Sequence, residues 1–163
     1  MSVIVPARYK QLRSATELDA LSIGYSSIHL ASVPELDAAQ QDYGVLSEGE
    51  ASEWRAEWTV IGHEGRCGDP IFIDTDDEDY PVYTAEHGMG EWNPRLIAFT
   101  FSHFVQILQR LQAFAHDRDN PVRLKRHPIT DSERVSFIEF IRSQSPDIDF
   151  EFWETMLETP EKT

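Results

Sequence analysis

Hydrophobic residues recur every three or four positions in several segments of the chain, which is the spacing of an amphipathic helix. The longest stripe consists of Phe104, Leu108, Leu111 and Ala115. Thr100 precedes it at the position of an N-cap, where its hydroxyl can accept a hydrogen bond from a backbone N–H. The pattern therefore predicts one long helix after Thr100 that lays a single apolar face on a sheet.

Four shorter segments have the same spacing, at residues 6–21, 32–43, 130–141 and 150–157. Capping boxes of the form Ser/Thr-x-x-Glu, which mark helix starts, occur at residues 14–17, 32–35 and 130–133. In the helix after Thr130 we expect Val135, Ile138 and Ile141 to share the apolar face. Residues 117–128 are expected to form a polar linker.

Five short segments rich in β-branched and aromatic residues predict strands. They lie at residues 25–31, 57–61, 70–73, 81–84 and 95–98, with an acidic loop expected at 45–53 and a turn through Gly88 and Gly90. Short connections favour antiparallel pairing, so the sequence predicts a single α+β domain with a mainly antiparallel meander sheet packed by helices. Residues 128–163 are expected to form a helical C-terminal extension packed on the same domain as residues 1–127.

The chain has 163 residues, the size of one domain with its own core. No apolar run reaches the roughly 18 residues of a membrane span, so we expect no membrane partner. Residues 1–6 lack the basic region of a signal peptide, and a single cysteine, Cys67, excludes an internal disulfide. These features are typical of a cytoplasmic protein.

The net charge of −15 is confined to the middle of the sequence. Residues 14–91 contain 18 acidic residues and two basic ones, whereas the rest of the chain is nearly balanced. An acidic surface repels nucleic acids and anionic membranes and attracts basic proteins. The distribution therefore indicates a basic protein partner and no nucleic-acid partner, although acidity that only maintains solubility remains an alternative.

Short motifs follow one another in a specific order between Trp58 and Phe104. They are Trp-Thr-Val-Ile-Gly at 58–62, Gly-Asp-Pro-Ile-Phe-Ile-Asp at 68–74, Pro-Val-Tyr at 81–83, His-Gly at 87–88 followed by Trp92, and Ile-Ala-Phe-Thr-Phe at 97–101. Upstream, Pro6-x-x-Tyr9 and the strand-then-helix pattern of residues 28–43 extend the set. In this order and spacing the chain resembles the SUKH superfamily, of the Smi/Knr cell-wall-regulator type.

The resemblance implies a non-catalytic protein-binding domain. Bacterial members of the family are largely immunity proteins that bind and neutralise toxin domains, often nucleases, and eukaryotic members act as regulatory partners. We therefore expect a bacterial immunity protein that neutralises a basic toxin by direct binding, without a cofactor and without enzymatic activity. The alternatives are a regulatory or scaffold adaptor without a toxin partner and, less favoured, a metal-dependent enzyme.

The candidate contact residues are acidic side chains and one tryptophan: Asp69, Asp74, Asp76, Asp77, Glu78, Asp79 and Trp92. The run from Asp74 to Asp79 lacks the glycine and glutamate of a calcium-binding EF-hand loop, so it is either a solvated face or a patch for a basic partner. Asp69 is expected to cap a turn or to contact the partner. Trp92, after two glycines, is expected to be half exposed as an anchor, with burial as the alternative.

A metal site has one candidate set, consisting of His63, Cys67, Asp69 and His87. Its spacing matches no common zinc motif, so we expect no metal. Trp58 lies in a predicted strand and is expected to belong to the core. Cys67 has no activating base close to it in the sequence, so we expect no thiol chemistry.

Overall fold

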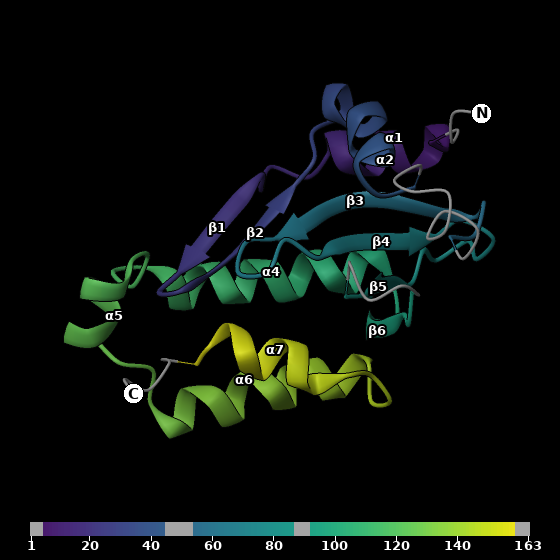
Figure 1. Cartoon of the computed structure of the whole chain (residues 1–163). Helices are drawn as coiled ribbons and strands as arrows, with labels where there is room; N and C mark the ends of the chain where they lie inside the picture. The colour runs from purple at the N-terminus through teal and green to yellow at the C-terminus, as the bar shows by residue number, and fades with distance from the viewer. Residues whose placement is uncertain (1–4, 45–53, 87–91, 159–163) are drawn as a thin grey trace.

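The structure, a computed structural model, describes residues 5–44, 54–86 and 92–158 (Figure 1). The loop predicted at 45–53, the turn through Gly88 and Gly90, and His87 lie outside these residues. In chain order the elements are α1 (Ala7–Ser14), β1 (Ala20–Ile23), β2 (Ser26–Leu30), the 3₁₀ helix η1 (Val33–Glu35), α2 (Leu36–Gly44), β3 (Trp58–Glu64), β4 (Pro70–Asp74), β5 (Val82–Thr84), β6 (Arg95–Ala98), α4 (Phe101–Ala115), α5 (Pro121–Arg126), α6 (Asp131–Gln144) and α7 (Phe150–Met156).

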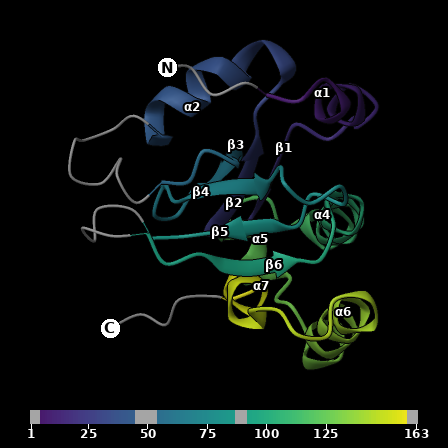
Figure 2. The same cartoon turned by 90° about the vertical axis from the view of Figure 1, so that its right-hand side faces the viewer.

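Within the described residues the strands form one six-stranded antiparallel sheet in the order β1-β2-β3-β4-β5-β6. Helix α4 packs on one face of this sheet, and α6 and α7 lie beyond β6 (Figure 2). The predicted α+β fold with an antiparallel meander sheet is confirmed. None of the helices in the described ranges is long and apolar enough to cross a membrane.

The two faces of the sheet have separate cores. On the face of α4, Phe104, Ile107, Leu108 and Leu111 are fully buried against sheet residues. Thr100 caps this helix as expected, since its hydroxyl accepts a hydrogen bond from the backbone N–H of His103 at 2.9 Å. On the other face a smaller, mainly aromatic cluster contains Trp54, Trp58, Val60, Phe72, Ala85 and Trp92.

The helix predicted over residues 6–21 is wrong in its second half. Helix α1 ends at Ser14, the predicted capping box at 14–17 does not form, and residues 20–23 are strand β1. Exposed and buried residues alternate along β1, which is the strand period, and Gly24 has a φ of +58° in the two-residue turn to β2. The spacing of Leu18 and Leu21 suited a helix, but pairing with β2 decided the outcome.

Strand β3 is longer than predicted and continues through Gly62 to Glu64. The register shifts between Val60 and Gly62, where the sheet has an irregularity of the β-bulge kind. A Cβ atom on Gly62 would lie 2.2 Å from the carbonyl oxygen of His29, so only glycine allows this approach of β2. The glycine therefore serves strand packing instead of ending the strand.

The C-terminal helices pack on β6 and α4. Trp153 Nε1 donates a hydrogen bond to the carbonyl of Ile97 at 2.8 Å. The capping box at 130–133 is confirmed. The prediction of which residues lie on the buried, apolar face of α6 is wrong in part. Phe137 and Ile141 are buried, whereas Val135 is 56% exposed. Residues 117–128 are not only a linker, because they contain α5.

Candidate functional site

The loop between β4 and β5 carries the densest run of acidic residues, and two of its carboxylates shape its backbone. Asp74 Oδ1 accepts a hydrogen bond from the N–H of Asp76, and Asp77 Oδ1 accepts one from the N–H of Asp79, each at 2.9 Å. These are Asx turns, in which a side chain takes the place of a backbone acceptor. Asp74 and Asp77 therefore have a structural role within the loop.

Neighbouring residues hold this loop against the domain. The ring of Tyr80 is buried at 5% exposure, and its backbone N–H donates to the carbonyl of Asp77 at 3.0 Å. From α1, Arg8 Nη1 donates to the carbonyl of Glu78 at 2.5 Å, and its guanidinium lies 5.4 Å from the centre of the Tyr80 ring. The loop thus presents its acidic side chains from a fixed backbone, a condition that lowers the entropic cost of binding.

Three carboxylates in the loop project to solvent. Asp76, Glu78 and Asp79 are exposed, and among the described residues no hydrogen bond or ion pair occupies their side chains. Burial raises the pKa of Tyr83 on the adjacent strand β5, and the charges of Asp74 and Asp77 raise it further. The charges of Asp74 and Asp77 therefore act on the neighbouring strand β5.

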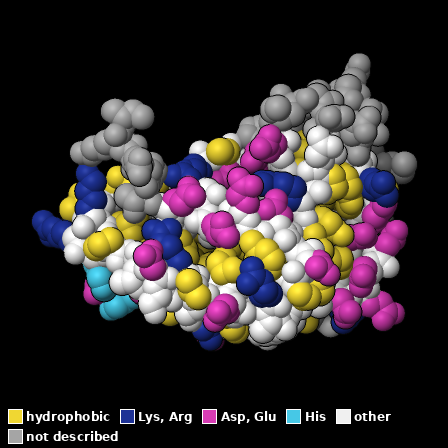
Figure 3. Space-filling view, turned by 90° about the horizontal axis from the view of Figure 1, so that it is seen from below, with side chains coloured by type: hydrophobic (Ala, Val, Ile, Leu, Met, Phe, Trp, Pro, Cys, Tyr) yellow, Lys and Arg dark blue, Asp and Glu magenta, His cyan; other side chains and the backbone are white. Residues whose placement is uncertain are grey.

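A surface cavity of about 420 Å³ borders the loop between α1 and the start of α4. Its lining includes Arg8, Leu12, Glu78 and Val105, and Leu12 is 38% exposed. Figure 3 shows acidic side chains gathered at the end of the molecule where β4 ends, with basic and histidine side chains at the opposite end. An acidic rim beside a partly apolar hollow is an arrangement that suits a basic protein surface.

Asp69 does not belong to this surface, because it precedes β4 whereas the acidic loop follows it. At about 3.3 Å per residue, the five residues of β4 separate the two by roughly 17 Å. Asp69 is also buried, with 8% of its surface exposed. Asp69 therefore lies apart from the acidic loop, and its role as a contact residue stays a prediction.

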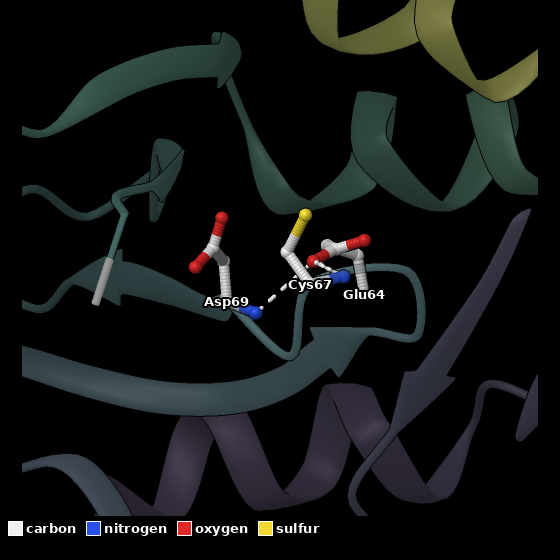
Figure 4. Close-up of side chains that lie close together, drawn as sticks. All are labelled: Glu64, Cys67 and Asp69. Atoms are coloured by element: carbon white, nitrogen blue, oxygen red, sulfur yellow. Dashed lines mark hydrogen bonds between the residues drawn. The ribbon is translucent and has the colours of Figure 1, made fainter. Parts of the chain in front are cut away.

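The turn that contains Asp69 is organised by Glu64, which the sequence did not single out (Figure 4). The carboxylate of Glu64 accepts hydrogen bonds from the backbone N–H groups of Arg66 and Cys67 at 2.8 Å and of Asp69 at 3.1 Å. The signal in the sequence was a glutamate directly before the turn sequence Gly-Arg-Cys-Gly. The side chain of Glu64 therefore caps this turn.

Glu64, Cys67 and Asp69 bring three possible metal donors within 4.8 Å of one another. Burial raises the pKa of the Cys67 thiol, and the charges of Glu64 and Asp69 raise it further. A thiol binds metal as the thiolate, and the Glu64 carboxylate already accepts three backbone hydrogen bonds. The cluster is therefore explained as a turn that Glu64 holds, and the raised pKa of Cys67 disfavours a reactive thiolate.

Trp92 is buried at 6% exposure, so the expectation of a half-exposed anchor is wrong. Its ring packs edge-on against Trp54, with centroids 5.1 Å apart, and Trp54 in turn contacts Trp58. This cluster covers the sheet face opposite α4, where a large aromatic side chain removes apolar surface from water. Trp58 belongs to the same cluster, as expected for a core residue.

A serine–histidine pair lies between α4 and the end of α6. His103 Nδ1 and Ser145 Oγ are 2.6 Å apart, and Ser145 Oγ also accepts the N–H of Phe99 at 3.0 Å. Ser145 is fully buried, so its hydroxyl cannot reach a substrate. Burial lowers the pKa of His103, and the neutral imidazole serves to join the two helices.

Comparisons of the chain with protein-family models, with curated proteins and with solved structures found no match.

Proposed function

We propose that this chain is a non-catalytic protein-binding domain that captures a basic partner protein through the β4–β5 loop. The observation that carries the proposal is the set of three exposed carboxylates, Asp76, Glu78 and Asp79, on a backbone held by Asx turns and by Arg8. Exposed charges on a fixed scaffold need no rearrangement to meet a positive surface. The hollow beside the loop offers Leu12 and Val105 as apolar contacts.

The kind of partner follows from the resemblance to the SUKH superfamily, which we propose as the family of this chain. A six-stranded antiparallel meander followed by the long helix α4 is consistent with that proposal. The partner is then a toxin domain, and binding neutralises it by covering the surface with which it acts. A nuclease surface that binds nucleic acid is basic and therefore complementary to this loop. We place the protein in the cytoplasm, where such a toxin would act.

Charge steering gives the proposal a kinetic signature. Attraction between opposite charges accelerates association by roughly 10- to 1,000-fold in favourable cases, and it weakens with salt because the screening length is about 8 Å at physiological ionic strength. Removal of the exposed loop charges should therefore slow association more than it accelerates dissociation. Asp74 and Asp77 are left intact, because their loss would also change the shape of the loop.

The test uses the triple variant Asp76→Asn, Glu78→Gln and Asp79→Asn and the polypeptide encoded by the neighbouring gene. Stopped-flow association is measured at about 50 and 300 mM salt. We expect the variant to associate about tenfold more slowly at low salt and to approach the unmodified protein at high salt. A matched control removes three exposed acidic charges elsewhere on the chain: Glu17→Gln, Glu139→Gln and Glu154→Gln.

The control should lower the association rate less than the loop variant, because its charges lie outside the proposed contact. Equal effects of the two variants would show that net charge alone acts, and the loop would lose its assigned role. An association rate at low salt that is unchanged in the loop variant would refute the proposal. Failure of the neighbouring gene product to bind would instead favour a regulatory adaptor over an immunity protein.

A further inference from the structure

Two histidines from different strands lie side by side on the sheet face opposite α4. His29 of β2 and His63 of β3 are directly paired across the antiparallel strands, so both side chains project from the same face. Their ring centroids are 5.2 Å apart, and the ring planes differ by 39°. Neither the acidic loop nor the proposed partner-binding role uses these residues.

A carboxylate from a third element approaches the same pair. Glu35, at the end of η1, places Oε1 at 3.7 Å from His29 Nε2. The N–H and the hydroxyl of Ser32 donate to this oxygen at 2.9 and 2.8 Å. The capping box therefore holds the Glu35 carboxylate beside the imidazole of His29.

Space and access for a ligand are present at this place. A surface cavity of about 450 Å³ is lined by the two histidines and Glu35, and by small residues that include Ala31, Ala38 and Gly62. The side chains of His29 and Glu35 are 39% and 54% exposed. An ion can therefore reach the imidazole of His29 and the Glu35 carboxylate from solvent.

The two rings are close enough to share a tetrahedral metal ion. A Zn–N distance of about 2.05 Å and an N–Zn–N angle of about 109° place two imidazole centroids roughly 5.2 Å apart. The separation found between His29 and His63 is 5.2 Å. We propose that His29, His63 and Glu35 form a binding site for a divalent transition metal ion such as Zn²⁺, with water in the fourth position.

This donor set is better suited to a metal than the turn at Glu64. Two imidazoles and a carboxylate are ligands that Zn²⁺ commonly takes in proteins. Among the described residues, the donor atoms of Glu64, Cys67 and Asp69 already lie within 4.8 Å of one another, and those of the proposed set do not. The Glu35 carboxylate must therefore rotate to complete the set. Rotation of Glu35 moves one exposed side chain and breaks its two hydrogen bonds with Ser32, whereas the Glu64 carboxylate accepts three backbone hydrogen bonds. The site would link β2, β3 and η1, and it is independent of the partner-binding proposal.

The test is calorimetric titration of the full, untagged chain with zinc chloride. We expect one equivalent of Zn²⁺ to bind, and we expect His29→Ala and His63→Ala each to weaken binding at least about tenfold. His29→Gln and His63→Gln should have the same effect while they keep a polar side chain of similar length in each strand. Glu35→Gln should weaken binding less, because an amide oxygen remains at that position.

Two control variants separate this site from other donors. His116→Ala removes an imidazole whose side chain is 85% exposed and that lies outside the site, and Cys67→Ser removes the thiol of the Glu64 turn. Both should bind Zn²⁺ as the unmodified chain does. Absence of zinc binding at about 1 mM, full binding by the His29 or His63 variants, or loss of binding in Cys67→Ser would each overturn the proposal.

Discussion

Arg118 is the residue whose replacement should most clearly separate the C-terminal helices from the rest of the domain. Its side chain is 5% exposed, and its two terminal nitrogens each donate to the Glu133 carboxylate at 3.0 Å. Further N–H groups donate to the carbonyls of His127 at 2.7 Å and Phe114 at 3.1 Å. One guanidinium thus joins the end of α4, the segment after α5 and the first turn of α6.

The magnitude follows from what Arg118→Met would leave behind. Removal of one partner of a buried ion pair costs about 3–5 kcal/mol, because the other charge remains without compensation. Glu133 is 29% exposed, so water can solvate part of its charge, and the lower end of that range applies. We therefore expect the free energy of unfolding to fall by about 3 kcal/mol. At this chain length that corresponds to a decrease in Tm of roughly 6–12 °C.

The assay is urea unfolding followed by circular dichroism, with Arg123→Met as the matched control. Arg123 forms an exposed ion pair with Asp119, and the loss of such a pair costs less than about 1 kcal/mol. Double-mutant analysis with Glu133→Gln isolates the interaction between Arg118 and Glu133. An Arg118→Met variant that loses less than about 1 kcal/mol would show that this contact does not hold the C-terminal helices in place.

The pH dependence of the same variant provides a second test. Burial acts to raise the pKa of Glu133, but hydrogen bonds from Arg118 and Thr130 and the charge of Arg118 outweigh it, so this pKa lies below its usual value. A carboxylate with a lowered folded-state pKa contributes stability above its unfolded-state pKa and loses it as the pH falls through the folded-state value. The difference in stability between Arg118→Met and the unmodified chain should therefore shrink below about pH 4.5.

Two further predictions concern buried side chains. Trp92→Ala should lower the free energy of unfolding by about 3–5 kcal/mol, and Trp92→Phe by less, because the structure places this ring in the core. A melting temperature unchanged to within a degree or two would show that Trp92 is not a core residue. The pKa of His103 is lowered by burial, so below about pH 6.5 the unfolded chain binds the proton more readily than the folded chain does. The free energy of unfolding of the unmodified chain should therefore fall between pH 7.5 and 5.5, by at most about 1.4 kcal/mol per pH unit, and His103→Gln should lack this fall. An equal dependence of the free energy of unfolding on pH in the two proteins would refute this role of His103.

Elements with local signals could be predicted from the sequence. The helix after Thr100 has its cap and its apolar stripe within one segment, and both are found in α4. Strand β1 has no such signal, because Leu18 and Leu21 fit helical spacing as well. Its conformation depends on pairing with β2, which the sequence of residues 20–23 does not contain.

The same distinction explains the outcome for the candidate site. Five acidic residues within 74–79 repel one another wherever they lie, so the exposure of Asp76 through Asp79 follows from local composition. The burial of Trp92 depends on Trp54, which lies far from it in the sequence, and no local pattern records that contact. Asp69 and Asp74 are close in sequence, yet an extended strand separates them in space.

The histidine pair shows what an antiparallel sheet adds to a sequence. His29 and His63 have no motif spacing, and only the register of β2 against β3 makes them neighbours. In the same sheet Trp58, at the other end of β3, is paired with Asp74 at the start of the acidic loop. The residues between Trp58 and His63 separate the two surfaces by roughly 17 Å, which exceeds the screening length of about 8 Å. Substitutions at the histidine pair should therefore leave the charge of the loop unaltered, so that failure of the metal proposal and failure of the partner proposal can be distinguished by experiment.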